Sequence, residues 1–226
     1  MEKQKYAAIV LAAGSGKRMN SQVHKQYLII QDRPVLYYSL KAFEDSAVDE
    51  IVLVVGKGEE EFCRKEIVDK YGISKVKAIV EGGKERYHSV FEGLKQTSDA
   101  DYVLIHDGAR PFVSEKIILD GIENAKKYGA AAPGVMPKDT IKVKDDFSFS
   151  KETLKRESLI AIQTPQVFKK DIIVKCHERV RENNVSVTDD TMVVEKYGYK
   201  VYLYDGDYIN IKVTTPEDLI LCEYLV

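Results

Sequence analysis

The stretch Tyr6–Met19, YAAIVLAAGSGKRM, joins an apolar run to a loop of glycines and basic residues. Tyr6–Leu11 is apolar throughout, without alternating polar residues, which is typical of a strand covered on both faces of its sheet. The glycine loop follows the carboxyl end of that strand, and open α/β sheets bind their ligands at this edge. The stretch therefore predicts a parallel α/β sheet with a ligand site beside its first strand.

Apolar runs recur along the chain and alternate with stretches of helical period. This alternation favours a mostly parallel, doubly wound sheet flanked by helices, in one domain spanning residues 1–226. Further strands are expected at Ile51–Val55, Val76–Val80, Tyr102–Ile105, Ala130–Val135 and Lys200–Tyr204. Helices are expected at Pro34–Phe43, Glu59–Tyr71, Glu85–Gln96, Ser114–Tyr128 and Lys170–Glu182, after Thr188–Asp190, and from Thr215, with Pro216 as the first residue and Asp218 as the capping-box partner.

Residues 137–163 depart from this alternation of apolar runs and helical stretches. Thr140–Lys144 alternates strictly, Asp145–Ser148 has the residue types of a turn, and Leu159–Ile162 follows a polar stretch. The pattern predicts a protruding β-hairpin with an exposed face. Such an arm commonly makes a subunit contact. The alternative is a hairpin that extends into solvent without a partner.

The composition excludes several classes of protein. The formal net charge is −2, with 44% hydrophobic and 31% charged residues, which gives no support for a nucleic-acid partner. Three isolated cysteines form no C-x-x-C pair, so neither a zinc site nor a disulfide framework is indicated. No run reaches the ~18 apolar residues of a membrane span. The N-terminus leads directly into a strand, without a signal peptide, so we expect a cytoplasmic location.

The glycine loop matches neither of the two common phosphate-binding motifs. In G-x-G-x-x-G the third glycine would stand where Met19 is, and the P-loop spacing is absent. What remains is a tight turn followed by Lys17, Arg18 and Lys25. Backbone N–H groups and nearby cations suit a triphosphate, and they would stabilise charge on a phosphorus under attack. The loop alone leaves open that it is a structural βα turn with solvated basic residues.

From its first strand to its last helix, the chain resembles the 2-C-methyl-D-erythritol 4-phosphate cytidylyltransferase family of the non-mevalonate isoprenoid pathway. Each shared motif is short, but ten of them occur in the same order over the full length. The motifs are Ala12–Met19, Lys25–Tyr27, Gly82–Arg86, Ser89–Leu94, His106–Pro111, Asp139–Lys142, Arg156 with Leu159, Gln163–Gln166 with Phe168, Thr188-Asp189 and Asn210–Leu219.

The resemblance implies a Rossmann-like nucleotidyltransferase that joins CTP to a polyol phosphate and releases pyrophosphate. Arg18 and Lys25 would stabilise the transition state, while Arg156 and Lys212 would position the attacking phosphate. That phosphate is ionised near neutral pH, so no general base is needed. Mg²⁺ would be bound mainly through the CTP phosphates, without a protein metal site.

The resemblance also assigns binding residues and an assembly. The arm would clasp a second subunit of a homodimer, with Thr140 and Arg156 reaching into the neighbouring site. The expected nucleotide contacts are Ala12, Ala13, Gly14, Ser15, Gly16, Gly82, Gly83, Arg86, Ser89, Asp107 and Gly108. The expected substrate contacts are Ala109, Arg110, Asp139, Thr140, Thr188 and Thr214.

Two positions depart from the pattern of the family. His24 stands where relatives usually have proline, and Gly108 where they usually have alanine, so a less rigid loop before Lys25 and a looser ribose contact are expected.

Two alternative functions stay open at this point. The nearest is ribitol-5-phosphate cytidylyltransferase, which shares Gln163–Gln166 and Asn210–Lys212. A catalytically silent nucleotide-binding module is the other, and the presence of Arg18, Lys25, Arg156 and Lys212 argues against it.

Overall fold

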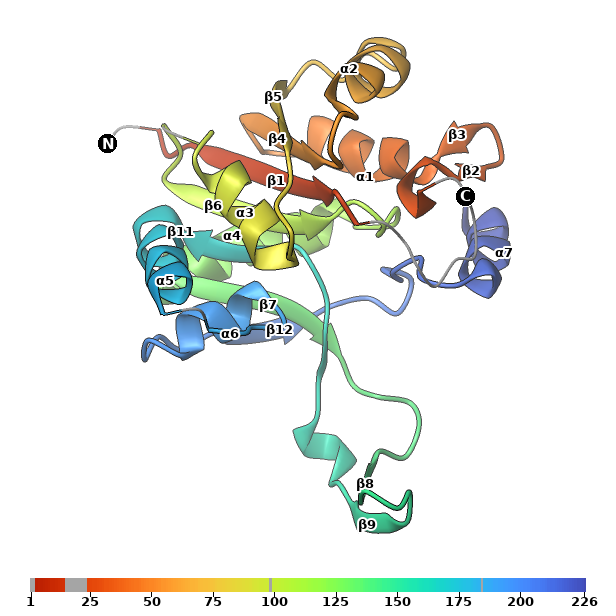
Figure 1. Ribbon diagram of the computed structural model, residues 1–226, viewed down its shortest axis with the longest axis vertical. Helices are drawn as coiled ribbons and strands as arrows, with labels where there is room; N and C mark the ends of the chain where they lie inside the picture. Colours follow the sequence, from red (N-terminus) through yellow and green to blue (C-terminus); the bar gives the residue numbers. More distant parts are fainter. Residues whose placement is uncertain (1–2, 15–23, 98, 184) are drawn as a thin grey trace.

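The computed structural model describes residues 3–14, 24–97, 99–183 and 185–226. An eight-stranded sheet lies between two layers of helices, and a narrow arm projects from one edge of this body (Figure 1). Four neighbouring strands run parallel: β6 (Tyr102–Asp107), β1 (Tyr6–Ala12), β4 (Glu50–Val55) and β5 (Val76–Glu81). Beyond β6, the strand β11 (Gln166–Lys169) is antiparallel to both β6 and β7 (Ala130–Val135). Strand β12 (Tyr202–Asp205) pairs in parallel with β7, and β10 (Ala161–Ile162) pairs antiparallel with the end of β7.

The strands expected from the sequence are present. They are β1 (Tyr6–Ala12), β4 (Glu50–Val55), β5 (Val76–Glu81), β6 (Tyr102–Asp107), β7 (Ala130–Val135) and β12 (Tyr202–Asp205). Two short sheet strands were not expected separately: β10 (Ala161–Ile162) and β11 (Gln166–Lys169). The four residues of β11 lead directly into a helix, so their pattern is too short to stand out. A small hairpin of β2 (Ile29–Ile30) and β3 (Arg33–Pro34) was also unexpected.

The helices follow the predicted ranges, with one break. They are α1 (Val35–Glu44), α2 (Glu60–Cys63), α3 (Arg86–Leu94), α4 (Glu115–Tyr128), α5 (Lys170–Glu182), α6 (Asp190–Glu195) and α7 (Pro216–Leu225). The helix expected at Glu59–Tyr71 starts as α2 and continues as a π-helical turn, Arg64–Asp69. Short 3₁₀ turns occur at Lys25–Tyr27 and Arg156–Ser158.

The helix ends carry capping residues, and those of α7 confirm the prediction from the sequence. Thr215 and Asp218 form a capping box around Pro216 at the start of α7. Gly129 ends α4 with a φ of 86°, a left-handed conformation that favours glycine. Asp189 caps α6 by accepting a hydrogen bond from the Met192 N–H. Pro34 precedes α1 as its N-cap, one position earlier than expected.

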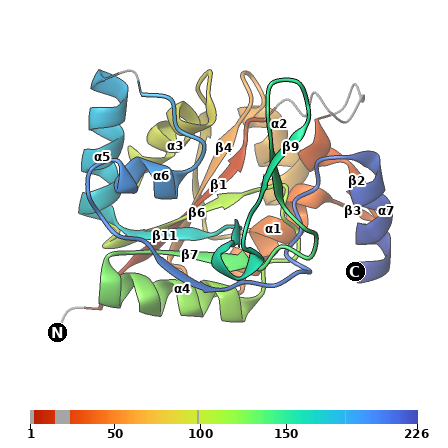
Figure 2. The same ribbon diagram turned by 90° about the horizontal axis from the view of Figure 1, so that it is seen from below.

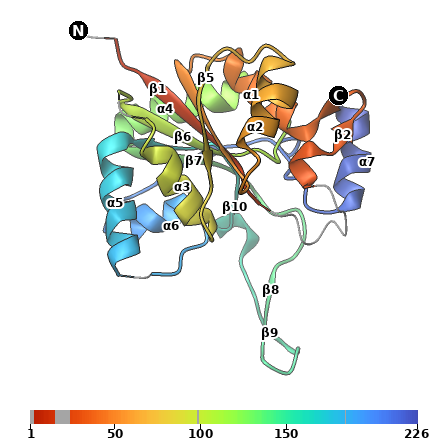
Figure 3. The same cartoon turned by 45° about the horizontal axis from the view of Figure 1, so that its top comes forward.

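Strand β1 is buried on both faces, as its unbroken apolar run predicted. Ala8 and Val10 pack into the core layer that contains α1 and α4. Ala7 and Ile9, which alternate with them, pack against α3, α5 and α6 on the opposite face, and Figure 2 shows these helices gathered on one side of the sheet. Helix α7 lies at the periphery beside β2 (Figure 3). Within the described residues, no helix combines the length and apolar content needed to span a membrane.

The predicted hairpin forms the arm. Strands β8 (Lys142–Lys144) and β9 (Ser150–Thr153) pair antiparallel, and their side chains are exposed. Ser148 has a φ of 69° in the turn between them. The flanking Phe147 and Phe149 are 83% and 71% exposed, so the tip of the arm presents two aromatic rings to solvent.

Candidate active site

Two adjoining cavities lie at the carboxyl ends of β1 and β6, the edge where open α/β sheets bind ligands. The larger measures about 450 Å³ and the smaller about 150 Å³. Three charged residues line both of them: Arg86, Asp107 and Lys212. Molecules bound in the two cavities would therefore meet at the same charged groups.

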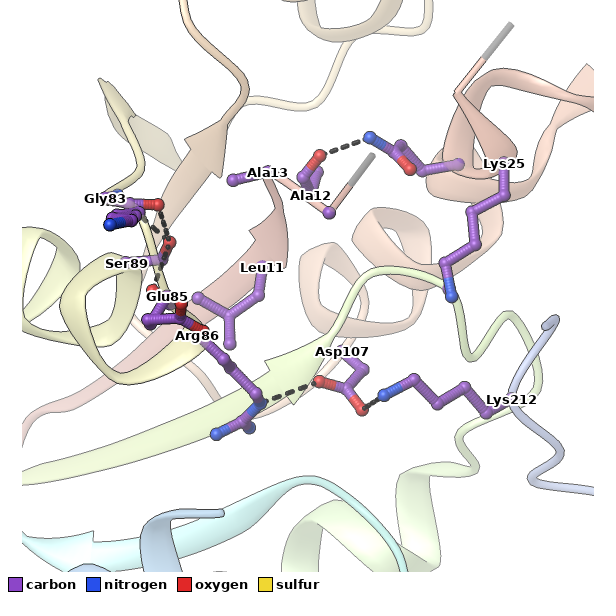
Figure 4. A pocket seen from close by; sticks show the side chains of 14 residues that line it. Leu11, Ala12, Ala13, Lys25, Gly83, Glu85, Arg86, Ser89, Asp107 and Lys212 are labelled. Atoms are coloured by element: carbon purple, nitrogen blue, oxygen red, sulfur yellow. Dashed lines mark hydrogen bonds and ion pairs between the residues drawn. The ribbon is translucent and has the colours of Figure 1, made fainter. Parts of the chain in front are cut away.

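Asp107, the last residue of β6, is the centre of this cluster (Figure 4). Its Oδ2 lies 2.7 Å from Lys212 Nζ, and its Oδ1 lies 3.3 Å from Arg86 Nε. The Asp107 N–H donates to the Thr164 hydroxyl at 3.1 Å. Burial alone would raise the pKa of this carboxyl, but the charges of Arg86 and Lys212 hold the pKa well below its usual range. Asp107 is therefore ionised at neutral pH.

Cations outnumber carboxylates around Asp107. Arg110 Nε lies 3.9 Å from Asp107 Oδ2, and Arg110 also donates to the Asn210 carbonyl at 2.7 Å. Burial lowers the Arg110 pKa and Asp107 partly restores it. Lys25 donates to the Val213 carbonyl at 2.9 Å, and its side chain points toward Asp107 and Lys212 (Figure 4). This surplus of positive charge suits phosphate groups.

Gly83 lines the far wall of the larger cavity, and Gly82, which precedes it, is in close contact with side chains. A β-carbon on Gly82 would lie 2.5 Å from the Ala13 β-carbon and 2.7 Å from the Ser89 hydroxyl, so only glycine fits there. The Gly83 N–H donates to that hydroxyl at 3.1 Å. A β-carbon on Gly83 would overlap His88. Backbone polar groups can therefore approach a flat ligand closely at this wall.

Most of the predicted site residues lie at these cavities. Arg110 and Thr188 line the smaller cavity, while Gly82 and Gly108 are packed nearby without lining either one. Ser15, Gly16 and Arg18 lie outside the described residues. The predicted residues that line the larger cavity are Ala12, Ala13, Gly14, Lys25, Gly83, Arg86, Ser89, Asp107, Ala109 and Lys212.

Four predicted residues are not brought to the cavities of this chain. Asp139, Thr140 and Arg156 are exposed on the arm, where Arg156 donates to the Lys138 carbonyl at 2.9 Å. The Thr214 hydroxyl donates to Asp218 at 2.9 Å, at the start of α7. Their roles as site residues stay predictions.

Each of the two departures has a close contact in the structure, and the expected looser loop and looser ribose contact stay predictions. His24 Nδ1 lies 2.7 Å from Glu59 Oε1, and Tyr27 donates its hydroxyl to the same carboxylate at 2.7 Å, so the turn that bears Lys25 is tied to the start of α2. The Gly108 N–H donates to the Leu11 carbonyl at 2.8 Å. A β-carbon at Gly108 would lie 2.9 Å from that oxygen, so glycine gives a close fit here.

Two glutamines that line the cavities, Gln166 in the smaller and Gln26 in the larger, were not assigned as site residues from the sequence. Gln166 accepts from the N–H groups of Asp190 and Thr191 at 3.0 and 3.2 Å and donates to Asp189 at 2.8 Å. Gln26, almost fully buried, donates to the Ala12 carbonyl. The motif Gln163–Gln166 was noticeable in the sequence, but its spacing carries no sign of these remote partners.

The sequence of residues 6–226 matches the family model described as IspD, 2-C-methyl-D-erythritol 4-phosphate cytidylyltransferase. The chain belongs to this family. The cytidylyltransferase of this name from Clostridium beijerinckii is 56% identical over 97% of both chains, and the one from Clostridium novyi is 54% identical over 98% of this chain and 96% of the relative.

Solved structures agree with this assignment to the IspD family. The crystal structure of 4-diphosphocytidyl-2C-methyl-D-erythritol synthase from Anaerococcus prevotii superimposes with a TM-score of 0.86 at 36% identity, covering 98% of this chain and 96% of that one. The 2-C-methyl-D-erythritol 4-phosphate cytidylyltransferase from Thermus thermophilus gives 0.79 at 30% identity, with 96% of each chain covered. IspD proteins are nucleotidyltransferases, and these matches do not favour the ribitol alternative.

Proposed function

We propose that this enzyme transfers the cytidylyl group of CTP to 2-C-methyl-D-erythritol 4-phosphate and releases pyrophosphate, in isoprenoid precursor synthesis. One observation supports this most: Arg86, Asp107 and Lys212 line both the larger and the smaller cavity. CTP would occupy the larger cavity, with its base against the backbone wall at Gly82 and Gly83. The acceptor would occupy the smaller one, beside Arg110 and Thr188.

The proposed reaction depends more on positive charge around the phosphates than on proton transfer by a side chain. An oxygen of the acceptor phosphate bonds to the α-phosphorus of CTP, and the bond from that phosphorus to the β-phosphate bridging oxygen breaks. Negative charge grows on the departing pyrophosphate, where Lys25 and Arg18 would stabilise it. Lys212, fixed by its 2.7 Å contact with Asp107, would hold the attacking phosphate. Because that phosphate is already ionised, no side chain has to remove a proton.

We also propose that Mg²⁺ enters this site on the CTP phosphates. Within the described part of the chain, no three His, Cys, Asp or Glu side chains gather into a metal-binding group. Both oxygens of Asp107 face cations, which leaves this carboxylate poorly suited to a full set of metal ligands. Triphosphate oxygens and water are the usual ligands of Mg²⁺ in such sites. The Mg²⁺ ion would neutralise part of the negative charge of the phosphates.

A cytoplasmic location of the enzyme stays a prediction.

Finally, we propose that the arm joins two copies of the chain. Its exposed Phe147 and Phe149 offer an apolar surface of the kind that interfaces bury. Arg156, Thr140 and Asp139 lie on the same arm, away from the cavities of their own chain. In a homodimer they would complete the acceptor site of the partner. A single chain would then lack part of the site.

The acceptor assignment predicts a clear difference between two polyol phosphates. With CTP and Mg²⁺, pyrophosphate release is expected with 2-C-methyl-D-erythritol 4-phosphate and at least ~100-fold slower with ribitol 5-phosphate, because a site built for one set of hydroxyl groups leaves polar groups unpaired with another. The measurement is a coupled pyrophosphate assay with each acceptor, with Mg²⁺ present and chelated. Activity with ribitol 5-phosphate alone would refute the assignment.

A further inference from the structure

A chain of charged side chains leads from the two cavities into the core behind them. Asp107 contacts Arg86, and Arg86 Nη1 lies 2.6 Å from Asp190 Oδ2. The other oxygen of Asp190 lies 3.1 Å from His177 Nε2. Asp190 begins α6 and His177 lies on α5, and neither residue is exposed to solvent. Buried groups of this kind are expensive unless they are paired, so the arrangement needs an explanation.

Asp190 is ionised in this arrangement. Burial opposes its ionisation, but the charge of Arg86 and the hydrogen bond from His177 outweigh burial and lower the Asp190 pKa. An ionised carboxylate only accepts hydrogen bonds, so His177 must donate through Nε2. The backbone N–H of Asp190 is held as well, at 3.0 Å from Gln166 Oε1. Both the main chain and the side chain of Asp190 are therefore fixed.

The fixed position of Asp190 determines how the Arg86 side chain is oriented. Its Nε faces Asp107 and its Nη1 faces Asp190, so two carboxylates on two different elements define the plane of the guanidinium. Without Asp190, the guanidinium would keep, among its ion pairs with described residues, only the 3.3 Å contact with Asp107, and it could rotate about its last torsions. Arg86 lines both cavities, so its orientation matters to whatever binds in either.

We infer that Asp190, oriented by His177, is a positioning residue that holds Arg86 in the orientation needed to bind the nucleotide. Asp190 touches neither cavity, while its neighbours Thr188 and Asp189 line the smaller one. Asp190 and His177 therefore connect the wall of the smaller cavity to Arg86, which would lie beside the nucleotide. This inference rests on the proposed placement of CTP in the larger cavity.

A double-mutant cycle on CTP binding tests the inference. Asp190→Asn keeps the shape of the side chain but removes its charge, and it is expected to weaken the CTP Kd by roughly tenfold in the wild-type background. In an Arg86→Met background the same change is expected to alter the Kd by less than about twofold, because the arginine that Asp190 positions is gone. Titration calorimetry with CTP alone gives all four dissociation constants.

His177 supplies a second pair of variants that leave the charge of Asp190 in place. His177→Phe removes the donor and is expected to weaken the CTP Kd by about threefold. His177→Gln keeps a donor at the position of Nε2 and is expected to restore the Kd to within about twofold of wild type. Should Asp190→Asn fail to fold, this pair decides the matter: an unchanged Kd in His177→Phe would overturn the inference.

The matched control is Val180→Ala, a cavity-forming change in the same helix, three residues from His177 at a fully buried position. It is expected to lower Tm and leave the CTP Kd unchanged. Asp190→Asn behaving like this control, or weakening CTP binding equally in both backgrounds, would show a merely structural role. A wild-type protein that binds CTP but forms no product would refute the proposed reaction, and the binding cycle would still report on Arg86.

Discussion

Replacement of Lys212 by alanine is expected to lower turnover by about 10²–10³-fold, which is the usual effect of losing one preorganised charge at a reacting group. The amine of Lys212 lies 2.7 Å from Asp107 and lines both cavities, so it can face the acceptor phosphate and the α-phosphate together. Removal of the Lys212 amine also takes away one of the positive charges that stabilise the buried Asp107 carboxylate. We therefore expect the free energy of unfolding to fall by about 1–3 kcal/mol. Initial rates of pyrophosphate release and thermal unfolding measure the two effects separately.

A control lysine distinguishes a local effect from a general loss of charge. Lys116 on α4 is exposed and pairs with Asp120 within its own helix, so Lys116→Ala is expected to leave turnover within about twofold of wild type. Lys212→Ala retaining more than a tenth of wild-type turnover would contradict the role proposed for Lys212.

Mixing two inactive variants is expected to restore activity if the arm acts in the neighbouring site. Arg156→Ala removes the proposed contribution of the arm, and Lys212→Ala removes that of the body, so each homodimer should keep about 1% of wild-type turnover or less. In a mixed dimer, one site combines an intact body with an intact arm. With equal amounts and random pairing, half of the dimers are mixed and each has one complete site of two, so about a quarter of wild-type activity should return.

The control mixture places both changes in the body of the chain. Lys25→Ala mixed with Lys212→Ala cannot form a complete site, because each body then lacks one lysine, and it should stay inactive. Activity is measured after the dimers have exchanged subunits, and sedimentation confirms the dimer. Failure of the Arg156→Ala and Lys212→Ala mixture to recover, with exchange shown, would contradict the action of the arm across the dimer.

The parts of the fold that the sequence predicted are those coded by neighbouring residues. Unbroken apolar runs such as Tyr6–Leu11 identified the buried strands, since a strand covered on both faces has no polar face to show. Thr215 with Asp218 marked the start of the last helix through local capping. The alternation in Thr140–Lys144 marked the arm. Each of these signals lies within a few residues of the structure that it specifies.

The parts that were missed depend on contacts between distant residues. Arg86 and Asp190 are 104 positions apart in the sequence, yet Arg86 Nη1 lies 2.6 Å from Asp190 Oδ2. Nothing in the neighbours of His177 indicates that it faces a buried carboxylate. Strand β11 was missed because its antiparallel place between β6 and β7 depends on tertiary pairing. Chemistry assembled from several elements cannot be read from spacing along one of them.

The most direct test of the proposed reaction follows the acceptor's own phosphate. 2-C-methyl-D-erythritol 4-phosphate carrying ¹⁸O in its terminal phosphate oxygens is incubated with CTP, Mg²⁺ and the enzyme, and the products are examined by ³¹P NMR and mass spectrometry. Attack on the α-phosphorus predicts that all of the label appears in the cytidine diphosphate-linked polyol and none in pyrophosphate. Label in pyrophosphate, or formation of CDP in its place, would contradict cytidylyl transfer at the Arg86, Asp107 and Lys212 site.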